Sequence, residues 1–416
     1  MDRKPSIFKI NLLSHLPEMS ITFLSLLAFI FLISLLFFGH ITGATQNHEL
    51  IRNLGFVIAA LFGFPMIIWR THIASRQAAT AEDSHVAETY TKAIEQLGAA
   101  NDAGIPKLEL RLGALYALEK IAKNNHSYHS QIMEVLCAYV RLHARVEGEN
   151  KSDTSVPNTA HFSPREDIQT AVTILCRRNL EFDQDNFRPD LSAVDLQGID
   201  LSNQRLENYN FARSNLRKAW IKGASLISCN FDLSTLDNAN LSKCDISKCS
   251  FNGTFLRDVF LEKSTFLDCE LKHATLTGAI LSSGAIQNVD ANGANLHGAF
   301  LDSVQITDSY FTLCHFESAN LSGSKLTNTD VNRSHFQESI LTNTSFKSVT
   351  VNKASFAEAE IYQTTFEDME LYSCDLSAEM LFHSRLVNIA PTSLSEEVTE
   401  LRQSANKKQT DTAAPL

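Results

Sequence analysis

An apolar residue recurs at every fifth position from Leu191 to Leu386, and no insertion breaks this period. The period marks forty positions; thirty-nine hold Leu, Ile, Val or Phe, and Ala291 is the exception. Five residues match neither the 3.6-residue turn of an α-helix nor the two-residue alternation of a strand. A short, unbroken period of this kind is typical of a solenoid, in which each repeat stacks on its neighbours.

The position two residues before each apolar residue is also restricted. From residue 214 to residue 374 it is almost always Ala, Ser, Thr, Cys, Gly or Val, with Met369 as the exception. Each unit is therefore expected to point one large apolar and one small side chain inward. Six of the eight cysteines occupy the small position: Cys229, Cys244, Cys249, Cys269, Cys314 and Cys374. This placement predicts small buried thiols rather than disulfides or metal ligands, and it fits a reducing compartment.

The repeats resemble those of the pentapeptide-repeat family, whose pattern is roughly A-[DN]-[LF]-x-x. Clear units begin at Ala239, Ala294 and Ala319, each followed by Asn and Leu. The resemblance implies a right-handed quadrilateral parallel β-helix (a β-solenoid) of about ten coils over residues 187–390, with four units in each coil. At a strand spacing of about 4.8 Å, the rod would be about 48 Å long.

Stacking coils of twenty residues predicts which side chains meet inside the rod. One column changes from Leu at its start to Phe316, Phe336 and Phe356, and Ala291 lies between Leu271 and Phe311, where we expect a small gap. The open ends of a β-helix expose backbone edges and need covers. We predict an N-terminal capping helix over residues 164–180, and a C-terminal cap with a mobile tail over residues 391–416.

Two uncharged stretches near the N-terminus predict a two-helix transmembrane hairpin over residues 21–69. Ile21–Phe38 has eighteen residues without a charge and Leu54–Trp69 has sixteen, against the roughly 20 that a span needs. Basic residues on both outer flanks then place both termini, including the N-terminal residues 1–20, in the cytoplasm, with the protein in the bacterial inner (cytoplasmic) membrane. A cleaved signal peptide and a buried soluble helix are the alternatives for the first and second stretch, respectively.

A juxtamembrane helical region is predicted over residues 70–143, followed by a flexible linker over 144–163. The stretches YTKAIEQLG from Tyr90, LRLGALYALEKIA from Leu110 and IMEVLCAYVR from Ile132 are similar to segments of bacterial membrane-anchored pentapeptide-repeat proteins of unassigned activity. The resemblance implies architecture and location, and no activity.

The outward positions of the rod are mostly polar, but one line of them carries large apolar residues. Just before the apolar residue of one column come Trp220, Asn240, Phe260, Ile280, Phe300, Asn320 and Ile340. The polar flanks of this line include Lys222, Lys243, Glu262 and Asp302. Large apolar side chains aligned outside, with such flanks, indicate a contact surface. The partner-surface candidates are Trp220, Phe260, Ile280, Phe300 and Ile340. The alternatives are docking of residues 70–180 on this line, or chance.

We find no sequence signature of an enzyme, a cofactor site or a metal site. The chain has no glycine-rich phosphate loop, nucleophile motif or metal-ligand spacing. His126 and His129 are interpreted as part of a solvated polar turn. His315 and His335 lie one coil apart and are expected to stack outside, as a weak metal pair at best.

The distribution of charge along the chain argues against one class of function, the binding of nucleic acid. Residues 181–390 hold 27 acidic and 16 basic residues, a net charge of −11, which argues against nucleic-acid binding. We therefore expect a non-enzymatic membrane-anchored scaffold or protein-binding module, whose partner is an unidentified cytoplasmic protein or a second copy of the chain. The resemblance to pentapeptide-repeat proteins implies one alternative, a DNA-mimicking regulator or protector of DNA gyrase or topoisomerase, although duplex DNA of this length carries about 28 charges. An enzyme or a channel component is a further, weaker alternative.

Overall fold

The computed structural model describes residues 30–31, 33–34, 37, 48–99, 107–146, 164–184, 187–371, 374–389 and 393–412. The chain divides into two compact units, Met1–Thr89 and Tyr90–Leu416.

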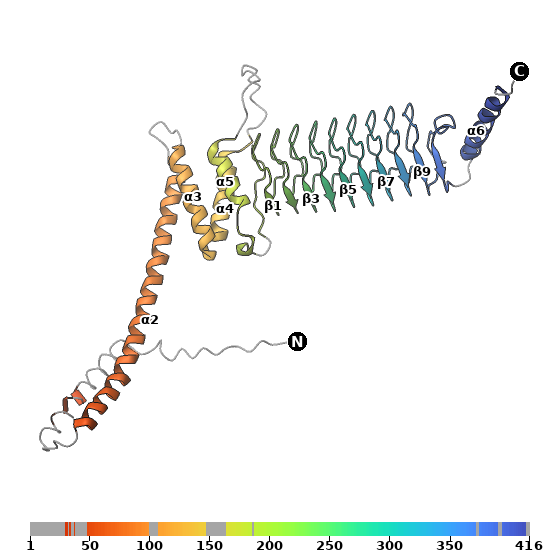
Figure 1. The fold of residues 1–416 in the computed structure, drawn as a ribbon. Coiled ribbons are helices and arrows are strands. Elements are labelled where there is room, and N and C mark those ends of the chain that lie inside the picture. The colour runs from red at the N-terminus through yellow and green to blue at the C-terminus, as the bar shows by residue number, and fades with distance from the viewer. Residues whose placement is uncertain are drawn as a thin grey trace. The chain divides into compact units, whose positions relative to one another are not determined.

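The first unit contains most of helix α2, which runs from His48 to Leu97 (Figure 1). This single helix continues through residue 69, where the sequence predicted the end of a hairpin. Most of the first predicted span, Ile21–Phe38, and the predicted N-terminal segment 1–20 lie outside the described residues. Of the helices in the described part of the chain, none is both long and apolar enough to cross a bilayer, so the hairpin gains no support here.

The second unit begins with the end of α2 and a layer of three helices. Helices α3 (Leu108–Asn124), α4 (His126–His143) and α5 (Glu166–Cys176) pack against one another in pairs. Their shared core consists of fully buried apolar side chains, among them Leu115, Leu118, Ile132, Leu136 and Val172. Because each helix carries its apolar residues along one stripe, burying the three stripes together is the stable arrangement.

The sequence interpretation of His129 was wrong. His129 is buried in the first turns of α4 rather than in a solvated turn. Its Nε2 lies 3.2 Å from a carboxylate oxygen of Asp183, and its Nδ1 lies 3.2 Å from the carbonyl oxygen of Ala122. Asp183 follows the short helix η1 (Leu180–Phe182), more than fifty residues further along the chain, so local sequence could not reveal this partner.

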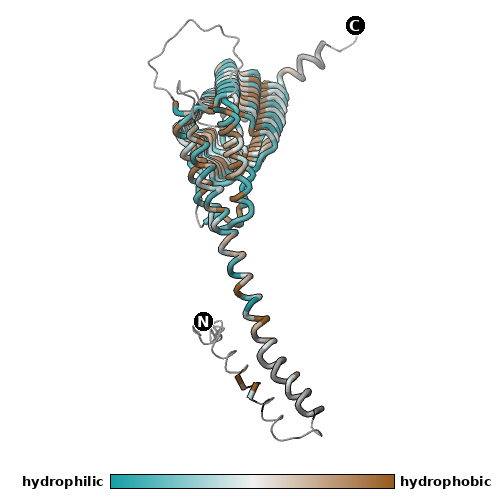
Figure 2. The backbone as a smooth tube through the Cα atoms, turned by 90° about the vertical axis from the view of Figure 1, so that its left-hand side faces the viewer, coloured by the Kyte–Doolittle hydropathy of each residue, from teal (hydrophilic) through white to brown (hydrophobic). Residues whose placement is uncertain are grey.

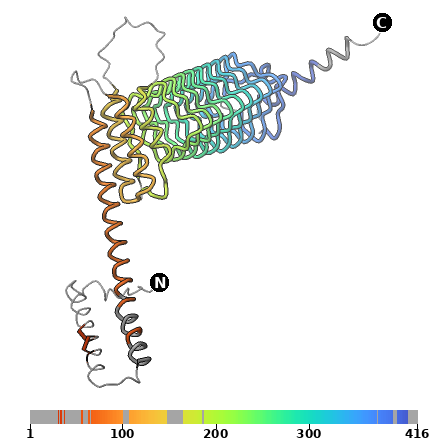
Figure 3. The backbone as a smooth tube through the Cα atoms, turned by 60° about the vertical axis from the view of Figure 1, so that its left-hand side comes forward, coloured from red at the N-terminus to blue at the C-terminus, as the bar shows by residue number. Residues whose placement is uncertain are grey.

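The repeat forms a parallel β-solenoid whose coils stack face to face (Figures 1 and 3). Ten short strands form one face in chain order, and each pairs with the next at a register of twenty residues, as Leu206 with Leu226. The strands are β1 Arg205–Glu207, β2 Ser225–Ile227, β3 Asp245–Ser247, β4 Thr265–Leu267, β5 Ala285–Gln287, β6 Gln305–Thr307, β7 Lys325–Thr327, β8 Ser345–Lys347, β9 Thr365–Glu367 and β10 Arg385–Val387.

The other three faces are held by single parallel bridges at the same register. These ladders run from Asp190 to Thr350, from Asp195 to Ser355 and from Asp200 to Glu360, which is nine levels each. Four faces in twenty residues confirm the predicted four units per coil. About nine coils are therefore regular on all faces, rather than the predicted ten, because the last coil is paired only through β10.

The interior follows the predicted columns. Residues of like hydropathy form continuous lines along the stack (Figure 2). Phe316, Phe336 and Phe356 are fully buried, with neighbouring ring centroids 4.7 and 5.0 Å apart and nearly parallel planes. Such columns of equal size allow the dense packing that a protein interior requires.

The small inward position is also confirmed. All six repeat cysteines are free thiols, and five of them are buried. Burial raises the pKa of the Cys244 thiol to about 11 and that of Cys314 to about 12. Cys244 Sγ lies 3.0 Å from the carbonyl oxygen of Ile221, the same contact that Ser264 Oγ makes with Leu241 at 2.6 Å. The thiols therefore serve as small core residues that satisfy a backbone carbonyl of the preceding coil.

The helical layer covers the N-terminal edge of the rod on all four faces. Arg141 donates to the carbonyl oxygen of Asp190 at 2.6 Å, and Arg145 forms an antiparallel bridge with Val194. On the other two faces, the Gln169 amide exchanges two hydrogen bonds with the backbone of Asp200, and Arg178 donates to the carbonyl oxygen of Glu207. Exposed edge groups would otherwise lack partners or recruit another strand.

Two predicted boundaries change as a result. The predicted capping helix at 164–180 corresponds to α5 and the turn after it, but α4 and the residues that follow it share the capping. Ala144–Val146 was assigned to a flexible linker, yet it pairs with the first coil because that edge needs backbone partners. The rest of the predicted linker, residues 147–163, lies outside the described residues.

The C-terminal end is covered by helix α6 (Ser393–Thr412). Val398 is fully buried, and the Arg402 guanidinium donates to the carbonyl oxygens of Leu381, Phe382 and Ser384. This helix continues to Thr412 through residues for which the sequence predicted a mobile tail. The cap itself lies where it was expected.

The predicted gap at Ala291 is present, and filling it should stabilise the rod. An apolar cavity of about 20 Å³ is lined by Leu271, Ala291, Phe311 and their neighbours. We expect Ala291→Val to raise the free energy of unfolding by about 1 kcal/mol, because new methyl groups occupy space that now lacks contacts. Denaturant unfolding of the purified chain measures the change.

Ala294→Leu is the control, since Ala294 is fully buried in the small inward position and does not line the cavity. Overpacking there should cost about 1–3 kcal/mol. Equal losses at both positions would contradict the assignment of free space to Ala291.

Candidate functional site

The outer row is the line of residues Trp220, Asn240, Phe260, Ile280, Phe300, Asn320 and Ile340. The structure places all seven on one face, because each pairs with the next in a single parallel ladder. Trp220, Phe260 and Phe300 are 56%, 41% and 48% exposed, and they alternate with less exposed residues. At a coil spacing of about 4.8 Å, the row extends about 29 Å along the rod.

The aromatic residues of the outer row replace a residue that stabilises the turn. Asn240 Oδ1 accepts a hydrogen bond from the backbone N–H of Ser242, and Asn320 does the same with Ser322, both at 3.0 Å. This is the local bond through which Asn and Asp favour turns. Phe260 and Phe300 cannot make it, and their rings are exposed, so the fold gains little from them. Their presence favours a role in contact with another molecule.

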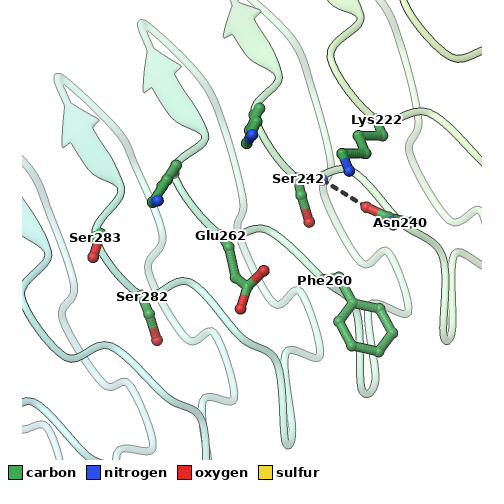
Figure 4. Close-up of a pocket in the computed structure, with 9 residues that line it drawn as sticks. Lys222, Asn240, Ser242, Phe260, Glu262, Ser282 and Ser283 are labelled. Carbon is green, nitrogen blue, oxygen red and sulfur yellow. Dashed lines mark hydrogen bonds between the residues drawn. The ribbon is translucent and has the colours of Figure 1, made fainter.

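A shallow pocket of about 260 Å³ lies beside the row (Figure 4). We call this site the lysine pocket, because Lys222, Lys243 and Lys263 are among its lining residues. The full lining is Lys222, Asn240, Ser242, Lys243, Phe260, Glu262, Lys263, Ser282 and Ser283. Within the described part of the chain, these lysines form no ion pair, although the repeat carries a net charge of −11. The pocket therefore offers three cationic groups and one carboxylate, Glu262, beside an apolar ring.

The sequence singled out Lys222, Lys243 and Glu262 only as polar flanks of the row, and it missed Lys263. Folding the chain by twenty residues puts Lys243 directly beneath Lys263, so the signal was available. The pocket itself was not predictable, because its depth depends on how the side chains of several coils pack.

The aromatic residues of the outer row are exposed along the side of the rod. Among the described residues, α4, α5 and the residues that follow each of them contact the first coil at Asp190, Val194, Asp200 and Glu207. These contacts lie at the end of the rod, and the row remains exposed along its side. The contacts of α4 and α5 with the rod are therefore at its end, and docking of the other residues of 70–180 on the row, the alternative that the sequence left open, stays an untested prediction.

A buried ionic cluster joins the three helices and is the strongest other candidate for a chemical site. Asp167 accepts hydrogen bonds from Tyr139 Oη at 2.6 Å, from Arg111 at 3.3 Å and from Arg165 at 2.6 and 3.0 Å. Burial acts to raise the pKa of the Asp167 carboxyl. The hydrogen bonds from Arg165, Tyr139 and Arg111 outweigh burial and hold that pKa at about 2. A carboxylate so fully paired is suited to holding helices together rather than to exchanging protons.

Comparison with known proteins identifies the repeats. The family model of pentapeptide repeats matches residues 190–226, 221–253, 244–282 and 314–350. Among solved structures, HetL from the cyanobacterium Nostoc sp. strain PCC 7120, a pentapeptide repeat protein involved in heterocyst differentiation regulation, is 23% identical; the match covers 43% of this chain and 85% of HetL, with a TM-score of 0.24.

Full-length QnrB1, a plasmid-mediated fluoroquinolone resistance protein, is 15% identical; the match covers 50% of this chain and 94% of QnrB1, with a TM-score of 0.27. No curated protein matches the chain. The family model thus identifies pentapeptide repeats within the rod. The two solved structures have low TM-scores and do not indicate a function.

The buried cluster predicts a specific dependence of stability on pH. Because the folded pKa of Asp167, about 2, lies below its unfolded value of about 3.9, its contribution is present above about pH 4 and is lost as the pH falls towards 2. We expect wild type to lose about 2 kcal/mol over this interval that Asp167→Asn does not lose. At neutral pH, Asp167→Asn should cost about 3 kcal/mol, since it leaves Arg111 buried and without its carboxylate.

Urea unfolding at a series of pH values, followed by circular dichroism, measures both effects. Glu134→Gln, at an exposed position on α4, is the control and should follow wild type. A wild-type profile identical to that of Asp167→Asn would exclude this role.

Proposed function

Because the rod of this chain is built from pentapeptide repeats, we propose that the chain is a non-enzymatic protein-binding module whose contact surface is the outer row. The observation that carries the proposal is the replacement of a turn-stabilising Asn by exposed Trp220, Phe260 and Phe300. Aromatic side chains at the centre of an interface contribute most of the binding energy in many complexes.

The lysine pocket defines the chemistry of the partner. An apolar side chain that packs on Phe260 would bring its neighbours within reach of Lys222, Lys243 and Lys263. A segment that carries acidic residues beside an apolar one satisfies both surfaces, since complementary charge speeds association and fixes register. The proposed partner is therefore a protein with an exposed segment that carries acidic and apolar residues. The crosslinking experiment described below distinguishes such a partner from a second copy of this chain.

The DNA-mimic alternative has weaker support. The outer row presents aromatic rings and the lysine pocket presents cations, whereas a duplex surface presents a regular array of anions. The repeat's charge of −11 also falls well below the roughly 28 charges of a duplex of equal length. A gyrase supercoiling assay with the added chain tests this alternative directly, and protection or inhibition would favour it over the contact-surface proposal.

We also propose that residues 21–69 hold the chain at the bacterial inner membrane. The support comes from the two uncharged stretches of the sequence and from exposed apolar side chains on the described part of α2, such as Phe56, Phe64 and Ile67. A helix with large apolar groups exposed in water is unfavourable unless a lipid or protein surface covers it.

The contact surface predicts separate effects on binding and stability. In Phe260→Asn and Phe300→Asn, the new amide can accept the turn hydrogen bond, so stability should stay within about 1 kcal/mol of wild type or increase. Binding of the partner should fall about 30-fold for each change, since an aromatic anchor contributes about 2 kcal/mol or more. Tyr310→Asn is the matched control, because Tyr310 is similarly exposed at the equivalent turn position on another face.

A photo-crosslinking benzoylphenylalanine at position 300 can capture the partner in cells. The same crosslinked protein should be lost with Phe260→Asn and kept with Tyr310→Asn, and Lys222→Glu should weaken its capture. A purified partner then gives the affinities. Capture that is unaffected by Phe260→Asn would reject the proposal, and crosslinks to the chain itself would assign the surface to a dimer.

The membrane proposal predicts that charges in the apolar part of α2 release the protein. Phe64→Asp combined with Ile67→Asp should shift the chain from the carbonate-washed membrane pellet to the soluble fraction, since each central Asp costs about 3 kcal/mol in a bilayer. Ala74→Asp combined with Ala78→Asp, at exposed positions further along the same helix, should leave the distribution unchanged. A wild-type chain found in the soluble fraction would reject the proposal.

A further inference from the structure

Three potential metal ligands converge on the face next to the outer row. His315 and His335 are neighbours in the ladder that runs from Asp195 to Ser355, and Glu317 lies two residues after His315 in the same coil. The two ring centroids are 4.9 Å apart. The sequence placed the two histidines one above the other but did not identify Glu317 as a third member.

The distances between the three ligand atoms match those around a metal ion. His315 Nδ1 lies 3.0 Å from Glu317 Oε1, His335 Nδ1 lies 3.4 Å from the same oxygen, and the two Nδ1 atoms are 3.2 Å apart. Ligands about 2.1 Å from a tetrahedral zinc ion are about 3.4 Å from one another. An ion about 2.1 Å from all three atoms would lie roughly 1.0 Å out of their plane, against about 0.7 Å for an ideal tetrahedral ion above three of its ligands.

Hydrogen bonds satisfy these three ligand atoms less well than a metal ion would. Each neutral imidazole carries only one N–H, so two Nδ1 atoms that face each other and a shared carboxylate oxygen need a particular choice of tautomers. A metal ion accepts all three lone pairs at once. The three side chains are partly exposed, so an ion can enter from solvent without a change in the coil.

We propose that His315, Glu317 and His335 form a site for a divalent transition-metal ion, with Zn²⁺ as the best match. Two imidazole nitrogens with one carboxylate select zinc and its neighbours in the transition series, whereas Mg²⁺ and Ca²⁺ prefer oxygen ligands alone. The fourth position faces solvent, where a water molecule or a side chain of another protein completes the coordination. The site also ties two successive coils together, so binding stabilises that part of the rod.

Zinc titration of the full-length chain tests the site. The chelator-treated protein is titrated with Zn²⁺ in the presence of a chromophoric competitor, and thermal unfolding is recorded with and without the metal. We expect one high-affinity equivalent in wild type. His315→Ala, His335→Ala and Glu317→Gln should each weaken binding by at least about tenfold, because each removes one ligand of three. The unfolding temperature should rise with Zn²⁺ in wild type and not in the double variant His315→Ala, His335→Ala.

Two controls separate this site from adventitious binding. His273→Asn removes an exposed histidine in a turn about two coils from the site, where Asn tolerates the positive φ of 55°, and it should bind Zn²⁺ like wild type. Mg²⁺ added in excess should not displace Zn²⁺. The proposal is overturned if the double histidine variant binds Zn²⁺ as wild type does, if His273→Asn loses binding equally, or if wild type binds no zinc throughout the titration.

Discussion

Backbone hydrogen bonds between successive coils are the interaction on which the rest of this structure depends. Every face of the rod is a parallel ladder at a register of twenty residues, so each coil supplies the partners of the next. A ladder of this kind has two ends with free donors and acceptors, and each end must be closed. The helical layer closes the first with Arg141, Gln169 and Arg178, and α6 closes the second with Arg402. The helices are thus required by the solenoid itself.

The same constraint divides the residues of each unit into two classes. Inward positions are restricted by column packing, as the stacked rings of Phe316 and Phe336 show. Outward positions need only allow the turn, and Asn or Asp serves best because its side chain bonds to the backbone. An exposed aromatic residue at such a position gives up that bond without gaining burial. Trp220, Phe260 and Phe300 make this exchange repeatedly along one face, so they carry more functional information than a single case such as Tyr310.

The sequence predicted the structural features that follow from the repeat period. It missed the features that depend on contacts between segments far apart in the chain. The columns, the buried cysteines and the cavity at Ala291 follow from counting by five and by twenty, because solenoid neighbours are at fixed sequence separations. The burial of His129 against Asp183, and the pairing of Ala144–Val146 with the first coil, involve segments that share no period. Glu317 was missed because it meets His335 from the preceding coil, off the column that was read.

A rigid rod places its surfaces at fixed separations, which relates the two proposed sites. Ile340, at the end of the outer row, follows His335 by five residues, so the two lie on adjacent faces of one coil. The lysine pocket extends from about three to about six coils away from Ile340, and Phe260 lies four coils away. A partner that occupies only the pocket and Phe260 is therefore independent of the histidines. A partner that follows the row as far as Ile340 comes next to the open coordination position, where its own side chain can complete the metal site.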